Sequence, residues 1–79
     1  MTDTERKIAE IWEHELRITG ISREDDIFSI GADSLGAISF VSDAAEEWGI
    51  TLRVSDVFAH PQIKELAALI DKHIGQRPD

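Results

Sequence analysis

The apolar residues of this chain recur at spacings of three and four over three stretches, which is the period of an amphipathic α-helix. The first stretch covers residues 3–18, the second Ser34–Trp48, and the third starts at His60-Pro61 and ends at Gly75. A strand pattern is confined to residues 50–54, where it has no partner and is interpreted as an extended linker. The chain is therefore expected to be all-α: a small four-helix bundle with three main helices, one short helix and a long first loop.

Local signals indicate where these helices begin and end. Thr2 followed by Glu5 is a capping-box pattern ahead of the first helix. Asp33 is a good N-cap for the second helix, and Gly49 is well placed to end it. Pro61 suits the first position of the last helix, where its missing N–H costs little.

Each main helix is expected to bury one apolar stripe. These stripes are Ile8, Ile11, Trp12 and Leu16; then Ile38, Val41, Ala45 and Trp48, with Phe40 and Ala44 beside them; and Ile63, Leu66, Ala67, Ile70 and Ile74. The loop over residues 19–33 contains the apolar residues Ile27, Phe28 and Ile30, so we expect it to pack onto the helices. Ser55 and Asp56 should open the short helix. Gly36 in the first turn of the second helix indicates either a close approach by another group or a helix start that is allowed to be soft, because glycine is a poor helix former.

The length of 79 residues fits a single domain over residues 1–79, with an ordered core of about 3–75 and a frayed polar tail at 76–79. Zero cysteines exclude disulfides, thiolate nucleophiles and cysteine metal sites. No segment has the length or composition of a membrane span or a signal peptide. We expect a cytoplasmic monomer, and Met1 with the short tail favours a free-standing protein, although an excised domain could look the same.

The net charge of −8 argues against nucleic-acid binding, which requires clustered Lys and Arg. Residues 24–52 contain no Lys or Arg and hold −7 of this charge. The acids are Glu24, Asp25, Asp26, Asp33, Asp43, Glu46 and Glu47. They form either a solvated face or a docking surface for basic partners.

The segment Gly31-Ala32-Asp33-Ser34-Leu35-Gly36 places a hydroxyl at the start of a helix, just after its capping carboxylate. The free N–H groups and the helix dipole favour a phosphate on Ser34, although the nearby acids oppose it. An ordinary helix start would look the same. A hydrolase elbow is disfavoured because it needs a core strand and a positioned histidine. No two of His14, His60 and His73 have metal-ligand spacing, so we expect no metal site.

Nearly the whole chain resembles an acyl or peptidyl carrier protein, a phosphopantetheine-binding family. The resemblance rests on Gly31-Ala32-Asp33-Ser34-Leu35, on Val57-Phe58-Ala59-His60-Pro61 downstream, and on Ile11-Trp12 in the first helix. It implies that Ser34 receives 4′-phosphopantetheine from coenzyme A, through a phosphopantetheinyl transferase. Asp33 and Leu35 match the motif residues beside it. The arm would then carry acyl, aminoacyl or peptidyl groups as thioesters, with no catalytic residue in this chain.

The resemblance also implies partners: an adenylating or acyl-loading enzyme, then condensation, ketosynthase, tailoring or thioesterase enzymes. Phe58-Ala59-His60-Pro61 and Trp12 are closest to the peptidyl carriers of nonribosomal peptide synthesis, whereas Ala32 is nearer the fatty-acid and polyketide style. The pathway is therefore expected to be of nonribosomal peptide or polyketide type. A fatty-acid carrier and an unmodified acidic interaction module remain alternatives. Expected docking residues are Leu35, Gly36, Ser39, Asp43, Glu46, Glu47, Val57 and Phe58.

Overall fold

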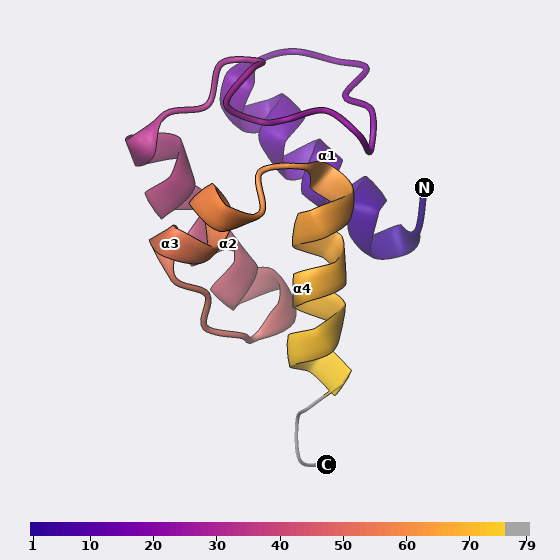
Figure 1. Cartoon of the computed structure of the whole chain (residues 1–79), viewed down its shortest axis with the longest axis vertical. Helices are drawn as coiled ribbons and strands as arrows, with labels where there is room; N and C mark the ends of the chain where they lie inside the picture. The colour runs from indigo at the N-terminus through magenta and orange to yellow at the C-terminus, as the bar shows by residue number, and fades with distance from the viewer. Residues whose placement is uncertain (76–79) are drawn as a thin grey trace.

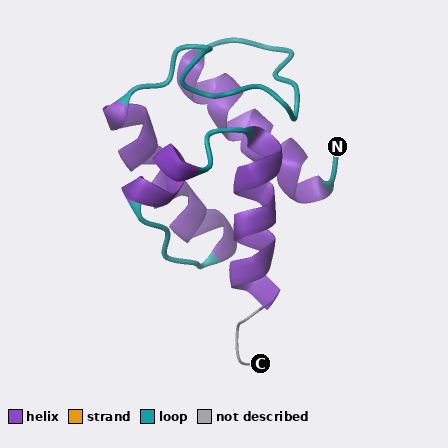
Figure 2. Ribbon diagram, viewed as in Figure 1, coloured by secondary structure: helices purple, strands orange, loops and turns teal. Residues whose placement is uncertain are grey.

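The computed structural model describes residues 1–75, which form four helices joined by loops (Figures 1 and 2). The helices are α1 (Asp3–Leu16), α2 (Ser34–Trp48), α3 (Val54–Ala59) and α4 (Ile63–Gly75). No strand forms within residues 1–75, so the expected all-α bundle with a long first loop is confirmed. The predicted frayed tail, 76–79, lies outside the described residues.

The start of α1 is fixed by the predicted capping box. The Thr2 hydroxyl accepts from the Glu5 N–H at 3.1 Å, and the Glu5 carboxylate accepts from the Thr2 N–H at 2.9 Å. The helix ends at Leu16 rather than at residue 18, because Arg17 turns left-handed with φ of 57°. The N–H of Ile18 then donates to the Glu13 carbonyl at 3.0 Å, which closes the helix end.

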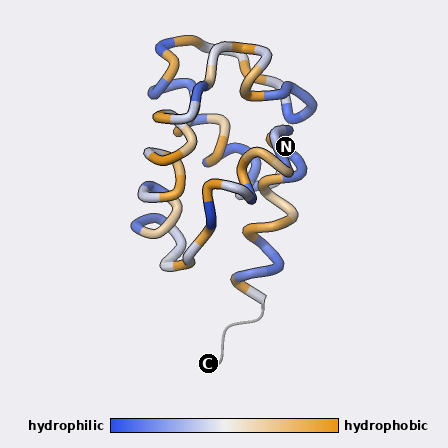
Figure 3. The backbone as a smooth tube through the Cα atoms, turned by 60° about the vertical axis from the view of Figure 1, so that its left-hand side comes forward, coloured by the Kyte–Doolittle hydropathy of each residue, from blue (hydrophilic) through white to orange (hydrophobic). Residues whose placement is uncertain are grey.

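The core is built around residues that are fully buried where the helices meet. α4 packs along α1, and α3 packs against α2 (Figure 1). Trp12 of α1 stacks on Phe40 of α2, with ring centroids 5.3 Å apart and an interplanar angle of 17°. Figure 3 shows apolar and polar residues alternating along the helices, as amphipathic packing requires. The largest fully buried side chains are Trp12, Phe40, Ile8, Ile27, Ile63, Leu66, Ile70 and Val57.

The face that α2 buries differs from the predicted stripe. Gly36, Ala37, Phe40 and Ala44 are buried, whereas Ile38 is 53% exposed. Ala45 is also exposed, and Val41 and Trp48 are only partly buried. The two stripes have the same spacing and lie one residue, or about 100°, apart on the helix. The small residues face inward because α2 has to accommodate the large Trp12 side chain of α1.

The predicted stripes of α1 and α4 are confirmed at their centres and are wrong at their edges. Ile8 and Trp12 are buried, whereas Ile11 and Leu16 are half-buried. Ile74, in the last turn of α4, is 37% exposed.

The last two helices begin one or two residues away from their predicted starts. α3 begins at Val54, one residue before Ser55, and the Asp56 carboxylate accepts from the Arg53 N–H at 2.9 Å. α4 begins at Ile63 and not at Pro61. The backbone just before Ile63 bonds to the first loop and not within the helix. The Pro61 carbonyl accepts from the Ile27 N–H at 2.9 Å.

The loop between α1 and α2 packs onto the helices, as predicted. Ile27 is buried, and so is Ile21, which the sequence analysis had not selected. The Arg23 guanidinium donates to both carboxylate oxygens of Glu5, at distances down to 2.7 Å. This ion pair, with the capping hydrogen bond from Thr2, lowers the pKa of Glu5 from 4.5 to about 2. The loop is thereby fixed to the first turn of α1.

Within residues 1–75, no helix has the length and apolar composition needed to cross a membrane.

The Glu5–Arg23 pair predicts a defined acid dependence of stability. The folded-state pKa of Glu5 lies below its ordinary value, so its ionisation stabilises the fold above pH 4.5 and this contribution is lost as the pH falls towards 2. Glu5→Gln keeps a capping side chain but removes the charge. We expect the melting temperatures of wild type and Glu5→Gln to differ at neutral pH and to converge as the pH is lowered from 4.5 to about 2.

Glu15→Gln is the matched control, since Glu15 is an exposed acid on the same helix. A Glu5→Gln difference that stays constant down to about pH 2 would contradict the role of the ion pair.

Candidate functional site

The candidate site is the first turn of α2, whose start is determined by Asp33. Asp33 has extended backbone angles, and its carboxylate accepts from the Gly36 N–H at 2.9 Å. Its carbonyl accepts from the Ala37 N–H at 3.0 Å, which begins the helical hydrogen bonding. The predicted N-cap is confirmed, and Ser34 becomes the first residue of the helix.

Ser34 and Leu35 both face outward from this turn. Ser34 is exposed, and the Leu35 side chain is 73% exposed. The positive end of the helix dipole lies at the Ser34 position and favours a negatively charged group there. The arrangement presents an accessible hydroxyl at a terminus that suits a phosphate.

Within residues 1–75, no hydrogen bond joins Ser34 to any of His14, His60 and His73. His60 is the C-cap residue of α3, and its N–H donates to the Asp56 carbonyl at 3.0 Å. The described part of the chain also contains no cluster of three or more His, Asp or Glu residues able to hold a metal ion.

Three large apolar side chains are exposed on α2 and α3: Leu35, Ile38 and Phe58. We call the two on α2, Leu35 and Ile38, the apolar face. Leu35 and Ile38 are three residues apart on α2 and therefore neighbours on its surface. Phe58 is 48% exposed and stacks on Phe28 of the first loop, with centroids 4.7 Å apart and an interplanar angle of 4°. The stack joins the loop that leads to Ser34 to α3.

Ile38 belongs to this face although the sequence analysis placed it in the core. The signal that could have found it is its spacing from Leu35, since a residue three positions after an outward-facing one shares its side of the helix.

Two of the predicted docking residues are buried and cannot contact a partner directly. Gly36 lies on the buried side of α2, against Trp12, and Val57 is fully buried in the core. Their expected place on the surface is therefore wrong, because the inward face of α2 includes Gly36 and the six-residue helix α3 buries Val57 to hold itself on the bundle. Docking through the remaining residues stays a prediction.

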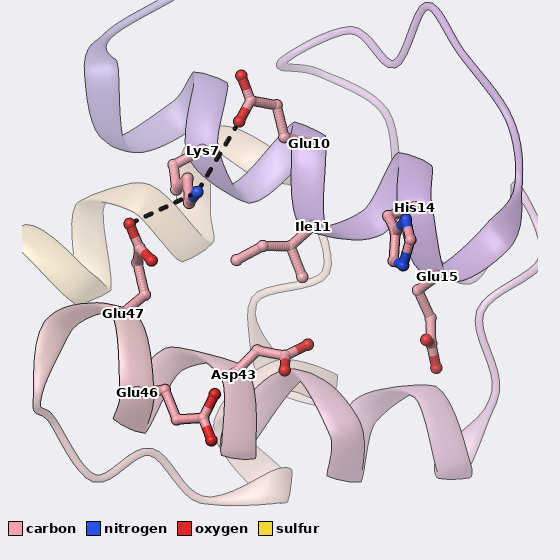
Figure 4. Close-up of a pocket in the computed structure, with 8 residues that line it drawn as sticks. All are labelled: Lys7, Glu10, Ile11, His14, Glu15, Asp43, Glu46 and Glu47. Atoms are coloured by element: carbon pink, nitrogen blue, oxygen red, sulfur yellow. Dashed lines mark ion pairs between the residues drawn. The ribbon is translucent and has the colours of Figure 1, made fainter.

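The predicted acidic residues of α2 lie along a groove of about 360 Å³ between α1 and α2. Figure 4 shows Asp43, Glu46 and Glu47 opposite residues of α1. Glu47 pairs with Lys7 of α1 at 3.6 Å, and Lys7 also lies 4.0 Å from Glu10. Ser39, another predicted docking residue, is half-buried. Part of the acidic stretch is thus used within the fold.

Comparison with known proteins places this architecture in a family. A family model for the phosphopantetheine attachment site matches residues 6–70. A nonribosomal peptide synthetase of Emericella nidulans is 40% identical over 73 residues, which cover 90% of this chain and 1% of that protein. HC-toxin synthetase of Cochliobolus carbonum is 42% identical over 69 residues, which cover 86% of this chain and 1% of that protein. The chain thus spans only a small part of these relatives.

Solved structures agree with this assignment. A chain in the complex of the phosphopantetheine transferase Sfp with coenzyme A and a peptidyl carrier protein superposes with a TM-score of 0.88. It is 35% identical, and the match covers 91% of this chain and 94% of that one. An active-site mutant of a peptidyl carrier protein superposes with a TM-score of 0.92 at 32% identity, covering 99% of this chain and 87% of that one.

The capping role of Asp33 can be separated from its charge. Asp33→Ala removes the acceptor for the Gly36 N–H and is expected to lower the free energy of unfolding by about 1 kcal/mol. Asp33→Asn keeps an acceptor oxygen and should cost much less. Denaturant titrations of the two variants measure both effects. Equal losses in the two variants would mean that charge, and not capping, determines the contribution of Asp33.

Proposed function

Since the chain belongs to the phosphopantetheine attachment-site family, we propose that Ser34 is the residue to which 4′-phosphopantetheine is attached and that residues 1–79 form one carrier domain. The observation that supports this choice of residue is the exposed Ser34 hydroxyl at the capped start of α2. The transfer joins the Ser34 Oγ to the phosphopantetheinyl phosphorus of coenzyme A. The nucleotide half of coenzyme A leaves, and the hydroxyl proton passes to a base of the transferase.

The residues around Ser34 fit such a group. The dipole of α2 favours the added phosphodiester, while the Asp33 carboxylate is held on the Gly36 N–H. Leu35 of the apolar face is exposed next to Ser34 and offers a contact to the arm, and the exposed Phe58 of α3 offers one to a partner enzyme. When attached, the arm supplies the thiol that the chain, without cysteine, does not have, and it carries acyl, aminoacyl or peptidyl groups as thioesters.

We propose that the pathway is of nonribosomal peptide type, because one of the relatives described above is a nonribosomal peptide synthetase and the solved structures are of peptidyl carrier proteins. The partners would then be a phosphopantetheinyl transferase, an adenylating or acyl-loading enzyme, and condensation, tailoring or thioesterase enzymes. Tethering to Ser34 raises the effective concentration of the carried group at each partner in turn. Loading from coenzyme A would take place in the cytoplasm.

The chain is proposed to act as a substrate of its partners and not as an enzyme. Ser34 lacks a paired base within the described residues, so the unmodified protein should not turn over ester substrates. The alternative to a carrier role is an acidic interaction module that is never modified. That alternative predicts that Ser34→Ala has no effect on function in cells.

Attachment at Ser34 is tested by intact-mass measurement after incubation with coenzyme A and a phosphopantetheinyl transferase. We expect a mass gain of one phosphopantetheinyl group in the wild type and none in Ser34→Ala. Ser29→Ala, which removes an exposed serine of the adjoining loop, is the matched control and should still be modified. Absence of a gain in the wild type, or a gain that survives Ser34→Ala, would sink the proposal.

The acidic residues of the groove between α1 and α2 predict an effect on the rate at which a partner associates. Glu46→Lys should slow association with the transferase by about threefold or more at low salt, since charge complementarity steers encounter. Glu46 is the better test than Glu47, because Glu47→Lys would also break the contact with Lys7 and place two lysines together. Surface plasmon resonance at two salt concentrations measures the effect.

Glu24→Lys, at an exposed acid of the first loop, changes the net charge equally and serves as the control. If Glu46→Lys associates at the wild-type rate at low salt, the groove acids are a solvated face.

A further inference from the structure

The side chain of Trp12 lies directly beneath the first turn of α2. It is fully buried and stacks on Phe40. Gly36, the third residue of α2, faces it: a Cβ atom added at Gly36 would lie 3.3 Å from Trp12 Cζ3 and 3.7 Å from Trp12 Cη2. Those distances leave no comfortable room for a side chain at position 36.

Tryptophan at position 12 buries a polar N–H group at a cost in stability, and its contact with Gly36 offers a reason for having tryptophan there. The Trp12 Nε1 atom is buried and has no hydrogen-bond partner among the described residues, which is unfavourable. A phenylalanine would avoid that cost and would retain much of the stacking. The atoms that only the larger ring supplies include Cζ3, which is the atom nearest the missing Cβ of Gly36 at 3.3 Å, and Cη2 at 3.7 Å.

Gly36 is also the residue that holds the cap of α2. Its N–H donates to the Asp33 carboxylate at 2.9 Å, and the added Cβ would lie 3.5 Å from that same carboxylate oxygen. A displacement at Gly36 is therefore passed to Asp33 and to Ser34, which lies between them in the chain. The stack on Phe40 restrains the indole, so the first turn of α2 is the part that has to move.

We propose that Trp12 and Gly36 are a matched pair of positioning residues that holds the first turn of α2, and with it the Ser34 hydroxyl, in place for modification. This inference rests on the proposed function of Ser34. Neither residue touches the incoming group: Trp12 acts through Gly36, and Gly36 acts through the cap and the helix start. The pair lies on the buried side of the turn, opposite the surface that a partner enzyme can contact.

The test is a double-mutant cycle of Gly36→Ala, Trp12→Phe and the double variant, made in the full chain. The single variants each break the match, one by crowding and the other by leaving a space. In the double variant the added methyl group occupies the space that the smaller ring leaves. Gly75→Ala is the matched control, because it adds the same methyl group to a helix where nothing lies within 4 Å.

The main measurement is the maximal rate at which a transferase modifies Ser34 when the carrier is saturating. A shift of a few tenths of an ångström at the helix start should lower that rate by about threefold to tenfold in each single variant. The double variant should return to within about twofold of the wild type. Gly75→Ala should be unchanged. The KM for the carrier should change little, since the outer surface of the turn is retained.

Thermal unfolding of each variant separates positioning from simple loss of structure. Alanine is a better helix former than glycine, so Gly36→Ala should remain folded while its maximal rate falls. Wild-type rates in both folded single variants would overturn the proposal. A double variant whose rate falls by the product of the two single losses would also overturn it, because the two residues would then act independently. If Trp12→Phe does not fold, a wild-type rate in Gly36→Ala is by itself sufficient to overturn it.

A second measurement keeps this inference distinct from the proposed function. Amide chemical shifts of residues 33–36 in the unmodified protein should move in both single variants and return in the double variant. If the wild type is not modified at all, the proposed function fails. The chemical shifts then still decide the pairing of Trp12 with Gly36, and shifts that fail to return in the double variant overturn it.

Discussion

The packing of the Trp12 indole between α1 and α2 is the contact on which the rest of the structure depends. The ring stacks on Phe40 and fills the space below Gly36, so it determines which side of α2 turns inward. Once Gly36, Ala37, Phe40 and Ala44 are buried, Leu35 and Ile38 have to face outward. The same contact that builds the core therefore creates the exposed apolar face beside Ser34.

The first loop is long, but its backbone and side chains are tied to the helices at several points. Glu5 and Arg23 fix it to the first turn of α1, the Ile27 N–H binds the Pro61 carbonyl ahead of α4, and Phe28 stacks on Phe58 of α3. A loop held by α1, by α3 and by the segment ahead of α4 delivers Asp33 and Ser34 in a defined place. The chain can thus present an exposed serine at a helix start although only 79 residues are available to build the core.

The negative charge of the central segment has more than one use in the fold. Asp33 caps α2, and Glu47 pairs with Lys7 of α1, so these two carboxylates have partners within the fold. Glu46 is exposed on the groove between α1 and α2. Net charge alone does not distinguish these roles, because a carboxylate that caps a helix and one that faces solvent contribute equally to the count of −8.

The sequence by itself determined the helical class, the bounds of α2, the capping residues and the serine at the start of α2, because these depend on contacts within a few residues. It did not determine the buried face of α2, the burial of Gly36 and Val57, or the start of α4 at Ile63. Two stripes on α2 have the same spacing, and only the bulk of Trp12 selects between them. Likewise, the pairing of Pro61 with Ile27 joins residues far apart in the chain, and only the tertiary structure brings such residues together.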